Sequence, residues 1–180
     1  DRLTIFSDEA AIELENARLL EETRHRLNEL EVINKISASL RTAETLDQML
    51  PIFVDGLLNA VNLTDGAIFL FNPESNTLRM HVRRGLYATY SIPPLQPGEG
   101  IMGHVFETGE TYLAPDFSAD PLAYQPSLAQ IQAGTGGVCL PLRTAREIVG
   151  VLVVSFPTAK KPTPDEIHLM GTLAEISGNT

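Results

Sequence analysis

The chain has 180 residues, a mass of 19.6 kDa and 43% hydrophobic residues, which is enough for one globular core with appendages. Its formal charge of −10 and pI near 4.8 argue against nucleic acid or an anionic membrane as a partner, because both attract clustered Lys and Arg. No apolar run reaches the roughly 18 residues of a membrane-spanning helix, and no signal-peptide pattern opens the chain. These features predict a cytoplasmic segment without membrane contact.

A long helix is predicted at the start of the chain. Residues 8–40 lack Pro and Gly and are rich in Ala, Glu, Leu and Arg, the strongest helix formers. Such a helix would extend about 50 Å, which is more than a small domain can cover. Its apolar residues shift between two seams, which favours a helix pair with a stutter, and a solvated linker helix is the alternative. The first seam consists of Ile12, Leu19, Ile33 and Leu40, and the second of Leu20, Leu27 and Leu30.

A second helix is predicted after a break near Arg41, with Thr42 or Thr45 as its N-cap. Its apolar residues are spaced three and four apart, so they form one wide face. Pro51 lies within this helix and should kink it or lie close to its first turn. The apolar face consists of Leu46, Met49, Leu50, Phe53, Leu57, Leu58 and Val61.

The remaining segments predict an antiparallel sheet and a final helix. Residues 67–71 and 77–84 flank a turn and read as a hairpin, and residues 85–97 read as a loop with room for a short strand. Residues 138–142 and 148–156 are continuously apolar, so they are predicted as buried strands at the centre of the sheet. The final helix should begin with Thr163 as its cap and Pro164 in its first position.

The central stretch, residues 97–116, reads as loop, short helix, turn and short strand. Gly98, Gly100 and Gly103 have the G-x-G-x-x-G spacing of dinucleotide-binding loops, but that motif requires a strand leading into its first glycine. Three prolines precede Gly98 here, and proline cannot donate to a sheet ladder. We therefore interpret Gly100 as the start of a short helix that ends at Thr108 and Gly109. One face of this helix carries Ile101, Val105 and Phe106.

The segment GEGIMGHVFETGETYLAPD, residues 98–116, resembles the segment that marks GAF domains, which are small sensory modules. The resemblance covers residues 27–179. It implies an α+β fold in three layers, with a central antiparallel sheet of five or six strands flanked by helices and a long N-terminal helix. It also implies a regulatory domain of a bacterial signal-transduction protein, and family frequency favours a sensor histidine kinase as the parent.

The ends of the chain resemble each other as well. Residues 15–19, ENARL, resemble the continuation of a last GAF helix, so residues 1–26 are predicted as a linker helix from a preceding similar domain. Residues 27–180 are then a sensor domain with a truncated C-terminal signalling helix. The resemblance implies a homodimer formed through the N- and C-terminal helices.

Catalytic chemistry is not indicated by the residues. The four histidines fall on separate predicted elements, and the sequence has neither a G-x-S-x-G elbow nor a Walker loop. The single cysteine, Cys139, lies in a predicted buried strand, where it should behave as a small hydrophobe. It is not placed for bilin attachment, and methionine-sulfoxide-reducing GAF relatives need several cysteines.

Resemblance to GAF domains places a ligand pocket between the sheet and the loops and short helix that cover it. The candidate lining residues are Phe69, Phe71, His104, Phe106, Asp116, Tyr124, Val138 and Leu140. The alternative role of the three phenylalanines is packing in the core. The alternative role of Asp116 is to close a turn. The sequence does not identify a cofactor or ligand. The main hypothesis is a small-molecule sensor, and the alternatives are a ligand-free dimerisation spacer and a small cysteine-dependent redox enzyme.

Overall fold

The computed structural model describes residues 2–41, 43 and 45–178, with side chains for residues 10–41, 43, 45–127 and 129–175. The chain divides into two compact units, residues 1–35 and 36–180. Across the described residues, no helix combines the length and apolar character that crossing a membrane requires.

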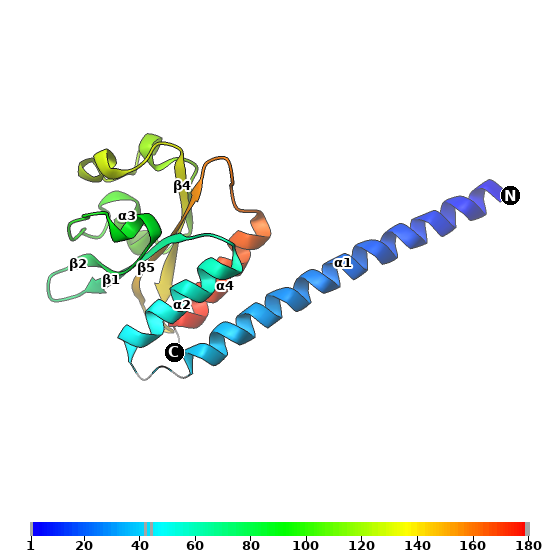
Figure 1. Ribbon diagram of the computed structural model, residues 1–180, viewed down its shortest axis with the longest axis horizontal. Helices are drawn as coiled ribbons and strands as arrows, with labels where there is room; N and C mark the ends of the chain where they lie inside the picture. Colours follow the sequence, from blue (N-terminus) through cyan, green and yellow to red (C-terminus); the bar gives the residue numbers. More distant parts are fainter. Residues whose placement is uncertain (1, 42, 44, 179–180) are drawn as a thin grey trace. The chain divides into compact units, whose positions relative to one another are not determined.

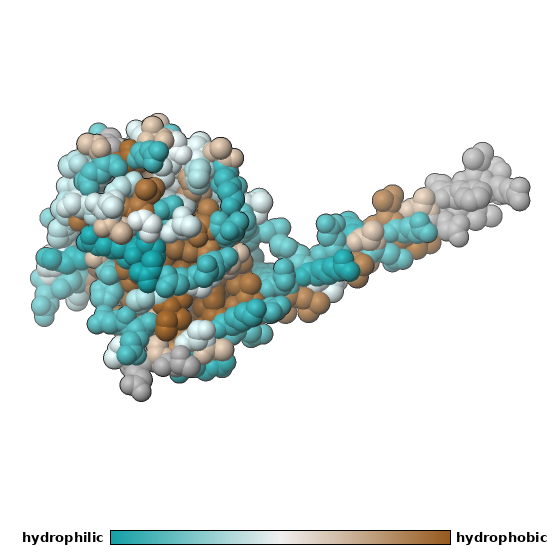
Figure 2. Space-filling view, viewed as in Figure 1, coloured by the Kyte–Doolittle hydropathy of each residue, from teal (hydrophilic) through white to brown (hydrophobic). Residues whose placement is uncertain are grey.

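Helix α1, Arg2–Leu40, is one continuous helix, as predicted, and it begins six residues before the predicted start at residue 8. Exposed ion pairs one turn apart line it, including Arg18 with Glu15 at 3.0 Å and Arg26 with Glu22 at 2.8 Å. Apolar side chains lie between these charged groups (Figure 2). Six of them are 47–73% exposed: Ile12, Leu14, Leu19, Leu20, Leu27 and Leu30.

The second unit is built on a five-stranded antiparallel sheet with strand order β2-β1-β5-β4-β3 (Figure 1). The strands are β1 Asp65–Asn72, β2 Thr77–Arg84, β3 Tyr112–Ala114, β4 Thr135–Arg143 and β5 Ile148–Pro157. The predicted hairpin of β1 and β2 is present, and β5 lies at the centre of the sheet between β1 and β4. The α+β fold with a five-stranded antiparallel sheet is therefore confirmed.

Two helices, α2 Leu46–Ala60 and α4 Pro164–Gly178, cover one face of the sheet (Figure 1). Pro51 lies inside α2, and Thr45 occupies its N-cap without a side-chain capping bond. The alternative cap, Thr42, lies outside the described residues. Thr163 caps α4 as predicted, and it does so in a capping box, because the Glu166 amide donates to Thr163 Oγ1 at 3.2 Å and the Thr163 amide donates to Glu166 Oε2 at 2.8 Å.

The opposite face is covered by α3, Gly100–Thr108, and by three 3₁₀ helices (Figure 1). These are η1 Gly85–Ala88, η2 Phe117–Ala119 and η3 Gln125–Gln130. As predicted, α3 begins at Gly100 and ends at Thr108, and it is followed by Gly109, a left-handed C-cap with φ of 69°. It buries Ile101 and Val105 against the sheet.

The structure refines the predicted loop at residues 85–97 and corrects the predicted start of the strand at residue 138. Residues 85–97 contain η1 and only one isolated bridge, Leu95 with Leu78, rather than a strand. The chain turns into η1 because Gly85 is left-handed with φ of 57° and the Leu86 amide donates to Asp65 Oδ1 at 2.7 Å. Strand β4 begins at Thr135 rather than at residue 138, because its glycines pair in the ladder while leaving room for the Phe117 ring, which a Cβ on Gly137 would overlap.

Candidate functional site

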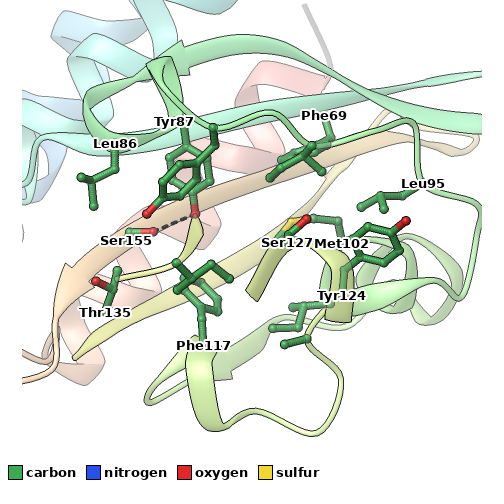
Figure 3. A pocket seen from close by; sticks show the side chains of 15 residues that line it. Phe69, Leu86, Tyr87, Leu95, Met102, Phe117, Tyr124, Ser127, Thr135 and Ser155 are labelled. Carbon is green, nitrogen blue, oxygen red and sulfur yellow. Dashed lines mark hydrogen bonds between the residues drawn. The ribbon is translucent and has the colours of Figure 1, made fainter. Parts of the chain in front are cut away.

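A mainly apolar cavity lies between the sheet and the elements that cover it (Figure 3). The space that the centre of a water molecule can reach inside it is about 60 Å³, which is room for a few waters. Among the residues whose side chains are described, fifteen line it: Phe69, Leu86, Tyr87, Tyr90, Ile92, Leu95, Ile101, Met102, Phe117, Ala123, Tyr124, Ser127, Ile131, Thr135 and Ser155.

The sheet forms the floor of the cavity through Phe69 of β1, Thr135 of β4 and Ser155 of β5. One wall comes from η1 and the loop after it, and another from the first turn of α3. Residues 116–134, which we name the lid, run from the end of β3 to the start of β4 and supply the remaining side chains. The cavity therefore depends on loops and short helices that are positioned by a rigid sheet.

Hydroxyl groups are the polar side-chain groups of the cavity. Tyr87 Oη and Ser155 Oγ are buried and form a hydrogen bond of 2.8 Å with each other (Figure 3). Burial raises the pKa of the Tyr87 phenol above its ordinary value, so the phenol stays neutral. Ser127 is 5% exposed, and its Oγ finds no hydrogen-bond partner among the described residues. A buried hydroxyl in this state needs water or a ligand to satisfy it.

A single carboxylate fastens the two ends of the lid. Asp116 Oδ1 accepts bonds from the Ser118 hydroxyl at 2.7 Å and the Ser118 amide at 2.9 Å. Asp116 Oδ2 accepts from the amide of Gly134, at the far end of the lid, at 3.2 Å. These bonds, led by the one from the Ser118 hydroxyl, hold the pKa of Asp116 below its ordinary value.

Two further polar contacts hold the body of the lid. Gln130 bonds both backbone groups of Ser91: the Ser91 amide donates to Oε1 at 2.8 Å, and Nε2 donates to the Ser91 carbonyl at 3.0 Å. The Tyr112 hydroxyl of β3 donates to both carboxylate oxygens of Asp120, at 3.1 and 3.2 Å. Side chains rather than a strand ladder therefore hold this segment closed, which is typical of segments that open locally.

Replacing Gln130 with alanine is expected to loosen the lid without unfolding the sheet, because it removes both bonds to Ser91 and little apolar packing. Hydrogen exchange at the amides of residues 117–133 should become about two- to tenfold faster, which corresponds to the loss of one or two exposed hydrogen bonds. Gln125→Ala is the matched control, since Gln125 is an exposed glutamine of the same 3₁₀ helix. Equal exchange in the two variants would contradict the role of Gln130.

The structure distributes the eight predicted site residues over several places. Phe69 and Tyr124 line the cavity. Phe71 and Phe106 stack on each other with ring centroids 4.5 Å apart, outside the lining, and His104 meets the Tyr112 ring edge-on at 5.8 Å. Asp116 lies at the base of the lid, as described above. Val138 and Leu140 are buried in β4, and they alternate with Cys139, which packs in the cluster on the cavity side.

Sequence reasoning missed Tyr87, Ser127 and Ser155. Ser155 did carry a signal, because it is the single hydroxyl in the apolar strand Ile148–Pro157 and a buried hydroxyl requires a partner. Tyr87 and Ser127 lie in segments that the sequence describes only as loop or small helix. The direction of their side chains depends on η1 and η3, which have no periodic pattern to reveal it.

Cys139 is fully buried and does not belong to the cavity lining. Burial raises the pKa of its thiol, so the nucleophilic thiolate is disfavoured. Where the structure describes side chains, no group of three or more His, Cys, Asp or Glu residues is arranged to hold a metal ion.

Solved structures share this fold. The GAF domain of a phosphoenolpyruvate-protein phosphotransferase from Coxiella burnetii superimposes with a TM-score of 0.73 at 23% identity, over 84% of this chain and 91% of that chain. Free methionine-R-sulfoxide reductase from Neisseria meningitidis, in complex with its substrate, gives a TM-score of 0.68 at 18% identity, over 83% of this chain and 86% of that chain. The fold is therefore found both in a GAF domain and in an enzyme.

Sequence comparison identifies the family as well as the fold. The Nif-specific regulatory protein of Herbaspirillum seropedicae is 28% identical over 157 residues, which are 83% of this chain and 28% of that protein. The chain thus spans less than a third of this relative. Residues 43–179 match the GAF domain family, so the match includes the sheet, its helical layer and the lid. The chain therefore belongs to the GAF domain family, as the resemblance of residues 98–116 to the marker segment of that family implied.

Proposed function

We propose that this chain is a non-catalytic sensory module that binds a small molecule under the lid and passes its state through dimeric terminal helices. The observation that supports this most directly is the mainly apolar cavity beneath the lid, which is lined by Ser127, whose buried hydroxyl has no partner among the described residues. A buried polar group without a partner costs stability, and a ligand that satisfied Ser127 would offset this cost. The cavity therefore favours the sensor over the ligand-free spacer.

The sheet provides a physical route from the cavity to the helices. Ser155 and Thr135 face the cavity, whereas α4 packs on β4 and α2 packs on β1 from the other side. A ligand that shifts the floor would change the surface on which these helices rest. A ligand can bias such an equilibrium only by as much as it binds the two states differently.

Dimerisation through the helices is the second part of the proposal. The exposed aliphatic side chains of α1 would be covered by a second copy, because a helix that exposes this much leucine is marginal alone. Residues 1–26 would then be the tail of a preceding similar module. Among possible parents, the likeness to a Nif-specific regulatory protein favours a regulator of that type over the histidine kinase that family frequency suggested. A redox enzyme is disfavoured by the burial of Cys139.

Native mass spectrometry of the 180-residue chain tests the dimer. The wild-type chain is expected to be a dimer, and the double variant Leu20→Glu, Leu27→Glu is expected to be a monomer, because it places like charges in the predicted seam. Both side chains are exposed, at 55% and 61%, so the folded unit should be unaffected. Leu113→Glu is the control, since Leu113 is a 44% exposed leucine on β3 rather than on a helix. A wild-type chain that is strictly monomeric would overturn this part of the proposal.

A further inference from the structure

We propose that the cavity takes an uncharged, mainly apolar ligand with one hydrogen-bonding group, and that it rejects carboxylates and phosphates. This inference rests on the proposed function, since it concerns the ligand class of the same cavity. It is carried by the chemistry of the lining, by the position of the nearby charges and by the Ser127 hydroxyl, which has no partner in the part of the chain that the structure describes.

The described lining contains no cationic side chain that would pair with a buried anion. Of the fifteen described lining side chains, none is Lys, Arg or His, and the bond between Tyr87 and Ser155 already uses one of their two hydroxyl protons. Transfer of an isolated carboxylate or phosphate into such a site is strongly unfavourable unless the charge is paired. A neutral molecule does not incur this penalty and gains from burial of its apolar surface.

The charged groups around the cavity also disfavour the binding of an anion. Asp65 holds the start of η1 by accepting the Leu86 amide, while Asp116 and Asp120 lie in the lid. The chain as a whole carries a formal charge of −10, and like charge repels an incoming anion. Among the described hydrogen bonds, one joins a cationic side chain to a lining residue. In it, Arg83 Nη1 donates to the backbone carbonyl of Tyr90 at 3.3 Å. Arg83 is exposed and lies outside the lining.

We assign the specific contact to Ser127, whose Oγ is buried in this structure and would reach a ligand when the lid opens. Its hydroxyl is neutral and can either donate to or accept from a ligand. The remaining lining is aliphatic and aromatic, which favours a ring or a short hydrocarbon chain. The reachable space of about 60 Å³ limits a ligand in the closed state to a small size. An aromatic ring needs more space than this, so the lid has to open for the aromatic probes used below to enter.

Methionine methyl NMR on the full chain tests the ligand class with benzyl alcohol and benzoate, which match in size and differ in charge. Met102 lines the cavity, while Met49 of α2 and Met170 of α4 are buried in the helical layer and serve as internal controls. We expect benzyl alcohol to shift the Met102 methyl signal in a saturable way. Benzoate at the same concentration should leave Met102 unshifted, and the signals of Met49 and Met170 should stay in place with both probes.

Ser127→Ala separates the hydroxyl contact from simple apolar filling. The variant should weaken benzyl alcohol binding about two- to tenfold, as expected for one lost hydrogen bond, and should not weaken the binding of toluene, which lacks a hydroxyl. Unchanged benzyl alcohol affinity in Ser127→Ala would overturn the role assigned to Ser127.

The outcomes separate the two proposals. If benzoate shifts Met102 at least as strongly as benzyl alcohol, the ligand class is wrong while the cavity remains a binding site, and Arg83→Gln would then identify the cation. If neither probe shifts Met102, even when Gln130→Ala loosens the lid, the cavity does not bind and the ligand part of the proposed function fails with it.

Discussion

Replacing Phe53 with alanine is expected to lower the free energy of unfolding by about 3–5 kcal/mol. Phe53 is 0% exposed and lies on the face of α2 that packs over the sheet. Removal of its ring takes away a large apolar surface and leaves a space that the neighbouring helix and strands can fill only in part. Urea denaturation followed by circular dichroism measures the change, which should appear as a lower midpoint with an unchanged slope.

Leu46→Ala is the control for Phe53 because it lies on the same helix and is 51% exposed. Its free energy of unfolding should change by less than about 0.5 kcal/mol. A loss below about 1 kcal/mol in Phe53→Ala would show that the layer of α2 and α4 does not behave as the packed core of this unit. It would also remove the route by which the sheet is proposed to act on the helices.

The second large effect is expected for Gly103→Ala, which should lower the free energy of unfolding by about 1–3 kcal/mol. Gly103 lies inside α3, and a Cβ there would overlap the carbonyl oxygen of Gln96 and approach the Gly98 amide nitrogen to 3.0 Å. Both neighbours are backbone atoms that cannot rotate away. The helix would have to move off the turn that precedes it, and Met102 would move with it at the cavity wall.

Gly171→Ala provides the matched control for Gly103→Ala. Gly171 also lies inside a helix, α4, but a Cβ there would meet nothing closer than 3.9 Å. Alanine is a better helix former than glycine, so this variant should gain about 0.5–1 kcal/mol. The two substitutions should thus have opposite signs in the same denaturation experiment. A gain of stability in both would mean that α3 does not pack closely on residues 96–98.

This contrast also explains the glycine spacing at residues 98–103. Gly98 and Gly100 are left-handed, with φ of 81° and 64°, and Gly103 permits a close backbone approach. Three local requirements therefore produce the G-x-G-x-x-G spacing without any phosphate. The prolines before Gly98 were sufficient to reject the dinucleotide interpretation from the sequence.

The parts of the fold that local chemistry determines could be predicted from the sequence. The hairpin of β1 and β2 follows from alternation and turn residues, and the start of α4 follows from the Thr163 and Glu166 capping box. The 3₁₀ helices could not be predicted in this way, because η1 depends on the distant contact between Leu86 and Asp65. Such contacts appear only when separate segments meet in space.

The candidate site was harder to predict than the fold, for reasons that β4 illustrates. Almost every residue of β4 is buried, because helices cover one face and the lid covers the other. A strand buried on both faces has no polar alternation, so its sequence does not reveal which side chains face the cavity. The sequence predicts Phe69 as a lining residue because it is an aromatic residue of β1. It does not predict the hydroxyl groups that give the cavity its polarity.

The hold of Asp116 on both ends of the lid has a consequence for how this module could diversify. A segment whose base is clamped by one residue can be exchanged as a cassette, since its entry and exit points stay fixed whatever lies between them. New recognition properties could thus be acquired by substitution or grafting between residues 119 and 133, while the strands beneath keep their register. The same architecture offers protein engineers a place to install a chosen specificity.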